Sequence, residues 1–157
     1  MALEVEAVKW IRLLLAITVL ALAWWAWQRL FVSDETRLRL QLGSMTRAVE
    51  QGNVLKLEGT IAADYSDDSG LDKSTLLGAV SSYRQQHDGL FIHLSDVEVK
   101  VEPDHEKAAV VFIAKVMARP KGGGETQLVC DRFRLYFRKT DQGWKLNRAE
   151  SPELKFE

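Results

Sequence analysis

The most apolar stretch of the chain runs from residue 10 to residue 32 and reads WIRLLLAITVLALAWWAWQRLFV. Its central part, from Leu13 to Trp27, contains no charged side chain. As an α-helix, a segment of this length would extend about 34 Å, whereas the hydrocarbon core of a bilayer is about 30 Å thick. The pattern therefore predicts a single membrane-spanning helix with Ile17 and Leu20 near its middle.

The ends of this stretch carry residue types that are typical of the membrane–water boundary, because indole rings favour that boundary and arginines reach out to headgroups. The predicted anchoring residues there are Trp10, Arg12, Trp24, Trp25, Trp27 and Arg29. A signal peptide cleaved after Ala21-Leu22-Ala23 is the main alternative, and a buried core helix is the other. Basic residues flank both ends almost equally, so the short N-terminal tail alone favours placing the rest of the chain on the extracytoplasmic side.

After residue 32 the apolar positions recur at helical spacing. Ser33 is a good N-cap, and the stripe that follows predicts a helix ending at Gln51-Gly52. Its apolar positions are Leu38, Leu42, Met45 and Val49. A second, short helix is predicted from Asn53 to near Tyr65, with Ile61 on its inner face, and a third from Asp72 or Ser74 to about His87.

The period then changes from 3.6 to 2, which predicts four strands. They are expected at residues 90–101, 108–119, 127–138 and 144–149. On the first strand, the expected inward positions are Phe91, His93, Ser95, Val97, Val99 and Val101. On the second they are Val110, Phe112, Ala114 and Val116. On the third they are Val129, Asp131, Phe133, Leu135 and Phe137.

Three helices before an antiparallel four-stranded sheet predict an α+β fold in which helices cover one face of a curved sheet. The expected organisation is an N-terminal tail and membrane helix at 1–32, one domain at 33–150 and a C-terminal tail at 151–157. Without the first 32 residues the chain holds 18 basic and 20 acidic side chains, a balance that argues against a nucleic-acid partner. The single cysteine, Cys130, excludes an internal disulfide, and the histidines show no metal-ligand spacing, so no metal or cofactor is predicted.

The segment RAVEQGNVLKLEGTIAADYSDDSG, a helix, and alternating strands that end in TDQGWKLNRAE resemble the nuclear transport factor 2-like superfamily. The resemblance spans about residues 37–150. It implies a sheet that curls around the helices and often leaves an apolar pocket. It also implies two kinds of relative, namely isomerase- or dehydratase-like enzymes and non-catalytic domains that commonly pair through their sheets.

His93 and Asp131 are the only ionisable side chains on the expected inward faces of the first three strands. A carboxyl group in an apolar cavity has a raised pKa and could exchange protons with a nearby imidazole, while Tyr65 and Tyr83 could donate hydrogen bonds to a bound carbonyl. The alternative is a structural role, in which a bulge turns Asp131 outward or His93 bonds to the backbone. The pocket itself is expected to be lined or filled by Phe91, Val110, Phe112, Phe133 and Phe137.

The opposite face of the sheet mixes apolar residues with arginines, which suits a protein partner. The residues predicted to bind that partner are Ile92, Leu94, Ile113, Met117, Arg132, Arg134 and Tyr136. The favoured function is therefore a non-enzymatic, membrane-anchored interaction domain, either a subunit or assembly factor of a membrane complex or a homodimer. The alternative is a small-molecule enzyme or binder that uses the pocket with His93 and Asp131.

Overall fold

The structure, a computed structural model, describes residues 16–21, 24 and 32–150. The chain divides into two compact units, Met1–Ser33 and Asp34–Glu157. In the first unit, residues 16–21 are helical and their side chains are exposed. No helix within the described residues is long and apolar enough to cross a membrane. Most of the predicted membrane helix, including Trp10, Arg12, Trp25, Trp27 and Arg29, lies outside the described residues.

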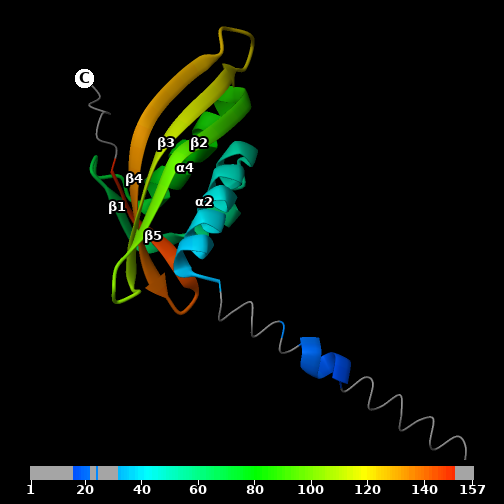
Figure 1. Cartoon of the computed structure of the whole chain (residues 1–157). Coiled ribbons are helices and arrows are strands. Elements are labelled where there is room, and N and C mark those ends of the chain that lie inside the picture. Colours follow the sequence, from blue (N-terminus) through cyan, green and yellow to red (C-terminus); the bar gives the residue numbers. More distant parts are fainter. Residues whose placement is uncertain (1–15, 22–23, 25–31, 151–157) are drawn as a thin grey trace, which may run out of the picture. The chain divides into compact units, whose positions relative to one another are not determined.

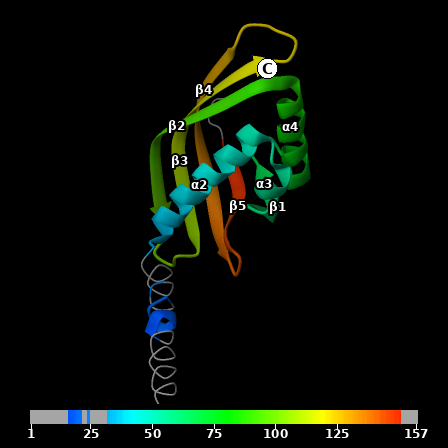
Figure 2. The same ribbon diagram turned by 90° about the vertical axis from the view of Figure 1, so that its right-hand side faces the viewer.

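The second unit has an α+β fold in which helices cover one face of a five-stranded sheet (Figures 1 and 2). The helices are α2 (Asp34–Gln51), α3 (Val54–Glu58) and α4 (Lys73–Gln86). Asn53 caps α3 by accepting a hydrogen bond from Lys56 N, and Asp72 caps α4 by accepting one from Thr75 N. The apolar stripe of α2 is buried as predicted, with Leu38, Leu42 and Met45 in the core.

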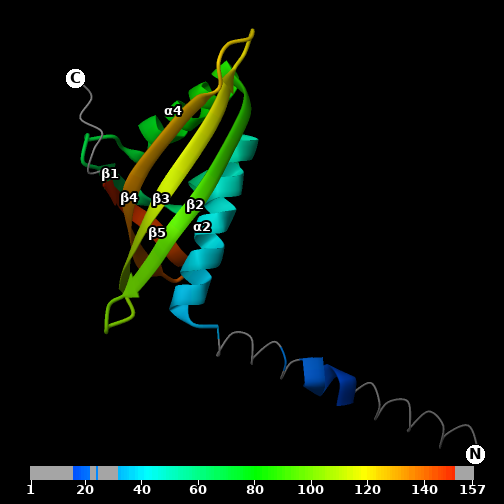
Figure 3. The same ribbon diagram turned by 45° about the horizontal axis from the view of Figure 1, so that its top comes forward.

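The strands are β1 (Ile61–Asp67), β2 (His87–Val101), β3 (Lys107–Pro120), β4 (Gln127–Thr140) and β5 (Gly143–Glu150), in the spatial order β1-β5-β4-β3-β2. Strands β2 to β5 pair antiparallel, as predicted, whereas β1 pairs parallel with β5. Figure 3 views strands β2 to β4 with α4 behind them, so it shows the face that the helices leave uncovered. We call this the outer face.

Strand β1 corrects the expectation that one helix continues from Asn53 to near Tyr65. The helix ends at Glu58, and Ile61 begins a strand whose partner residue is Leu146. Val54, Leu57 and Ile61 are spaced like one helical face, so local pattern alone favours a helix there. The pairing with β5, a contact between segments far apart in the sequence, decides the conformation instead.

Strand β2 changes faces part-way along because of a β-bulge. Asp96 has a φ of 52°, and the pairing register with β3 shifts between Ser95 and Glu98. After the bulge, Val97, Val99 and Val101 face the helices as predicted. Before it the prediction is wrong: Ile92 and Leu94 face inward, and the side chains on the outer face are Phe91, His93 and Ser95.

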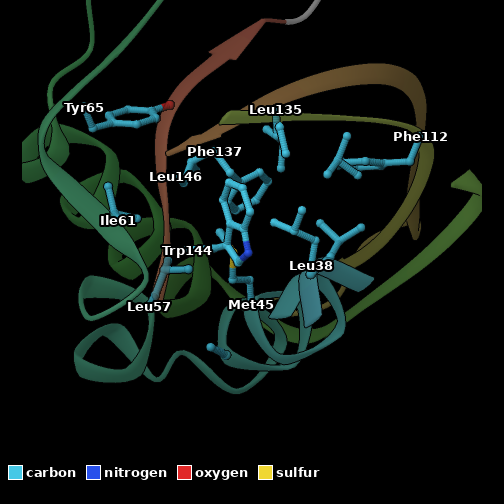
Figure 4. Packing of buried hydrophobic residues seen from close by; sticks show 14 of the residues in the cluster. Leu38, Met45, Leu57, Ile61, Tyr65, Phe112, Leu135, Phe137, Trp144 and Leu146 are labelled. Carbon is cyan, nitrogen blue, oxygen red and sulfur yellow. The ribbon is translucent and has the colours of Figure 1, made fainter. Parts of the chain in front are cut away.

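The core lies between α2 and the inner face of the sheet. Leu38, Val110 and Phe137 are the largest side chains that are fully buried. Figure 4 shows Leu38 and Met45 of α2 facing Phe137 and Trp144 of the sheet. Because β3 and β4 alternate without interruption, their inward positions are those predicted from the sequence.

Asp34, the first residue of α2, ties that helix to the end of the sheet where β4 meets β5. Its carboxylate accepts hydrogen bonds from Trp144 Nε1 at 3.2 Å and from Lys139 Nζ at 3.0 Å, and lies 3.3 Å from His105 Nδ1. Burial alone would raise the pKa of the Asp34 carboxyl, but the hydrogen bonds from Lys139 and Trp144 outweigh it and lower the pKa.

The free edge of β2 is fastened to α2 by two side chains. Glu50 Oε1 accepts a hydrogen bond from Ile92 N at 2.8 Å, and Arg39 Nη1 donates one to Val97 O at 2.8 Å. Both contacts satisfy backbone groups of an edge strand that no further strand covers.

Candidate functional site

A cavity of about 400 Å³ lies between the helices and the inner face of the sheet. Its helical wall is formed by Leu42, Met45, Thr46, Val49, Leu76 and Val80. Its sheet wall includes Tyr65, Ile92, Leu94, Phe112, Ala114, Phe133 and Leu135. The volume lies within the range of small-molecule sites, and the lining is almost entirely apolar.

Helix α4 packs on the core through partly buried apolar residues and is bonded to the rest of the domain at both ends. None of its residues is fully buried, and Leu76, Leu77 and Val80 are half-exposed. At the N-terminal end Lys73 Nζ donates to Ile61 O at 3.1 Å. At the C-terminal end Arg84 donates to the carbonyls of Glu50 and His87. The helix is therefore fixed over the sheet without filling the space beneath it.

Small side chains on the sheet keep this space open. Ala114 lies on β3 opposite Asp131 of β4, and Ala149 lies on β5. A larger side chain at either position would extend into the cavity. The cavity is not enclosed, so a small molecule can enter it from solvent.

Tyr65 supplies the main polar group of the lining. It is 4% exposed, and Figure 4 shows its ring projecting from β1 with the oxygen at the inner end. Burial raises the pKa of Tyr65 to about 12, and the carboxylates of Asp67 and Asp68 add to the shift. The hydroxyl therefore stays protonated at neutral pH, and within the described part of the chain it makes no hydrogen bond. Thr46, in contrast, already donates to Leu42 O.

The structure does not bring His93 and Asp131 together. Asp131 lies on the inner face of β4, is 7% exposed and accepts a hydrogen bond from Arg132 N at 2.7 Å. His93 precedes the bulge, so it is exposed on the outer face opposite Lys115. The prediction that both side chains face the pocket is wrong for His93, because the bulge reverses the alternation of β2. Asp131 faces inward but is not among the residues that line the cavity.

The two tyrosines named from the sequence also separate. Tyr65 lines the cavity, although from a strand and not from a helix end. Tyr83 lies in the last turns of α4, where its ring stacks on His87 with 4.1 Å between ring centroids, and it does not line the cavity. This stack, together with the bond between His87 Nδ1 and Tyr83 O at 2.8 Å, stabilises the junction of α4 and β2.

The residues expected to line the pocket divide into three groups. Phe112 and Phe133 line the cavity, whereas Val110 and Phe137 are buried in the core beside it. Phe91 lies on the outer face and is 52% exposed. Helix α4, Ile92 and Leu94 also line the cavity, which the sequence does not predict. The helical spacing of Leu76 and Val80 was visible in the sequence, but nothing in it distinguished a cavity wall from ordinary core packing.

Among the residues predicted to bind a partner, Ile113, Met117, Arg132, Arg134 and Tyr136 lie on the outer face. Ile92 and Leu94 do not, because they face the cavity. Within residues 16–21, 24 and 32–150, no group of three or more His, Cys, Asp or Glu side chains is placed to hold a metal ion.

No family model matches the chain, and no curated protein matches its sequence. Solved structures do match it in three dimensions. A proposed scytalone dehydratase from Novosphingobium aromaticivorans superposes with a TM-score of 0.67 at 13% identity, over 73% of this chain and 79% of that one. A proposed dehydratase of the nuclear transport factor 2-like family from Streptomyces avermitilis gives 0.64 at 20% identity, over 75% and 94%. A nuclear transport factor 2-like superfamily protein from Salmonella enterica gives 0.66 at 11% identity, over 75% and 89%.

The domain has the nuclear transport factor 2-like fold. The resemblance noted in the sequence is thus confirmed at the level of fold. At these identities the likeness extends no further, because one fold carries many unrelated activities. The function of the domain therefore depends on the chemistry of its own cavity and surfaces.

Proposed function

We propose that the nuclear transport factor 2-like domain binds a small, apolar, uncharged molecule in the cavity between α2, α4 and the sheet. The observation that carries the proposal is the cavity of about 400 Å³ with its apolar lining. The lining contains no basic side chain, so a carboxylate or phosphate would lose its hydration without gaining a partner. The two matched structures described as dehydratases support a small-molecule role.

Tyr65 would orient such a molecule. Its protonated hydroxyl can donate one hydrogen bond to a carbonyl or ether oxygen of the ligand. If the domain is also an enzyme, Asp131 is the candidate acid or base, because it lies on the inner face between two cavity-lining neighbours, Ala114 and Phe133. His93, exposed on the outer face, is not placed to assist it.

Replacing Ala114 with phenylalanine tests the binding site. The new side chain would extend from the middle of β3 into the cavity and occupy the space of the ligand. The neutral fluorescent probe N-phenyl-1-naphthylamine should bind the full-length protein. We expect Ala114→Phe to weaken that binding by at least about tenfold, which corresponds to about 1.4 kcal/mol. Fluorescence titration measures the effect, and circular dichroism checks that the variant is folded.

Ala109→Phe is the matched control. Ala109 lies on the same strand but faces outward, opposite Tyr136 of β4, so the same substitution leaves the cavity unchanged. Its probe affinity should equal that of the unmodified protein. A folded Ala114→Phe variant that binds the probe as tightly as the control would show that the cavity is not the binding site.

We also propose, on the sequence of residues 10–32 alone, that this segment anchors the domain to a membrane with the domain on the extracytoplasmic side, where a membrane-protein partner could bind it. Placing arginines at both Ile17 and Leu20 should cost about 2.5–3.5 kcal/mol each near the middle of a bilayer. We expect the double variant to leave the membrane fraction on alkaline washing, whereas Ile17→Leu with Leu20→Ile should stay. Retention of the arginine variant would exclude this segment as the anchor.

A further inference from the structure

A row of apolar side chains crosses the outer face of the sheet near the β3–β4 loop. Phe91 pairs with Met117 across β2 and β3, and Met117 pairs with Leu128 across β3 and β4. Their exposed fractions are 52%, 39% and 67%. Three large apolar side chains in direct cross-strand contact form a continuous surface, unlike the single exposed residues that are common on proteins.

Basic side chains border this row. Lys115 and Arg119 lie two positions on either side of Met117 and so share its face, and Arg132 lies on β4 opposite Ile113. We call these three cations, together with Phe91, Met117 and Leu128, the distal patch.

The cations of the distal patch differ from the arginines elsewhere on β4 and β5, each of which has an acidic side chain within 4.0 Å. Within the described part of the chain, Lys115, Arg119 and Arg132 make no salt bridge. Elsewhere on β4 and β5 the arginines are paired: Arg138 with Asp64 at 2.8 Å, and Arg148 with Asp68 at 2.9 Å. Asp68 and Glu150 line a small pocket together with Arg132, but both carboxylates already pair with Arg148.

A hollow of about 340 Å³ lies within the patch, lined by Gly89, Leu90, Phe91, Met117, Arg119 and Thr126. Phe91 and Met117 give it apolar surface, and Arg119 and Thr126 give it polar groups. An apolar side chain of a partner could occupy this hollow. An acidic side chain next to it in the partner could then pair with the guanidinium of Arg119. Apolar contact beside a charge pair is the usual composition of a protein interface.

We propose that the distal patch binds an acidic, amphipathic segment of another protein, whose apolar side chains cover Phe91, Met117 and Leu128 while its carboxylates pair with Lys115, Arg119 and Arg132. A second copy of the same patch does not fit, because face-to-face contact would bring three unpaired cations against three others. The proposal is independent of the cavity, which lies on the other face of the sheet.

A synthetic peptide that carries leucine and phenylalanine on one helical face and glutamate on the other is the probe. Fluorescence anisotropy with the full-length protein in neutral detergent should show binding that weakens as salt is added. The double variant Lys115→Glu with Arg132→Glu should lower the affinity by at least about tenfold. Phe91→Ser should lower it as well, because it removes apolar contact without changing charge.

Arg138→Glu with Arg148→Glu is the matched control, since it changes the net charge equally on the same sheet but outside the patch. This variant should bind the peptide like the unmodified protein. An equal loss of peptide affinity in both double variants would show that only the net charge matters, and this would overturn the proposal. So would recruitment to phosphatidylglycerol vesicles that depends on Lys115 and Arg132 while the peptide does not bind, or a dimer that Phe91→Ser disrupts.

Discussion

Phe137→Ala is expected to lower the free energy of unfolding by about 3–5 kcal/mol, the usual cost of removing a buried phenylalanine ring. Phe137 is 1% exposed and lies on β4 in the core between α2 and the sheet. Truncation would remove its contacts and leave a void that the rigid strands cannot close. Urea unfolding of the full-length protein in neutral detergent, followed by tryptophan fluorescence, measures the loss.

Phe91→Ala makes the same chemical change on the outer face. Because Phe91 is 52% exposed, its truncation should cost less than about 1 kcal/mol. The ratio between the two variants is the informative result. Similar losses of unfolding free energy in the two variants would mean that Phe137 does not lie in the interior. The position of β4 over α2 would then also be wrong.

Asp34→Ala should cost about 2–3 kcal/mol at neutral pH. The substitution leaves Trp144 Nε1 and Lys139 Nζ without their acceptor, and hydrogen bonds to a charged group are worth about 1.5–3 kcal/mol each, partly recovered here by water. Asp34 is 13% exposed but Lys139 is 37% exposed, so solvent weakens the contact with Lys139 and the larger share of the loss should come from the bond to Trp144.

The difference between Asp34→Ala and the unmodified protein should depend on pH. The pKa of Asp34 is lower in the folded state than its ordinary value of 3.8, so the unfolded chain takes up the proton first as the pH falls. The stabilisation is therefore complete above pH 3.8 and is lost as the pH falls through the folded-state pKa. The free energies of unfolding of the two proteins should therefore differ at neutral pH and approach each other at acid pH, which urea denaturation at both pH values measures. Asp34→Asn separates charge from shape, and a variant as stable as the unmodified protein at neutral pH would show that the charge is not needed.

The parts of the fold that the sequence predicted are those where a local pattern continues undisturbed. The stripe through Leu38 and Leu42 places α2 on the core, and the alternation of Phe112 with Ile113 and of Phe133 with Arg134 places β3 and β4 correctly. In each case the periodicity of apolar residues and the burial of one face carry the same information. The inward position of Asp131 follows from the same register.

The predictions that proved wrong concern segments where a distant contact or a single residue overrides the local pattern. Strand β1 depends on pairing with β5, whose residues lie about eighty positions later, and helical spacing at Ile61 gave no sign of it. The bulge at Asp96 inverts the first half of β2, so one residue moved His93 out of the site and Leu94 into it. The cavity could not be predicted either, because its walls come from α2, α3, α4 and all five strands, and their spacing is not written in any local pattern.

The contacts of Glu50 and Arg39 with the edge of β2 have a consequence for aggregation. An exposed edge strand offers free backbone groups to strands of other molecules, and such pairing is the first step of β-sheet polymerisation. Here Ile92 N and Val97 O are already bonded to side chains of α2, and the bulge between them distorts the strand further. An incoming strand would have to break both contacts and displace the helix. The residues that fasten α2 to the sheet therefore also protect this edge against intermolecular strand addition.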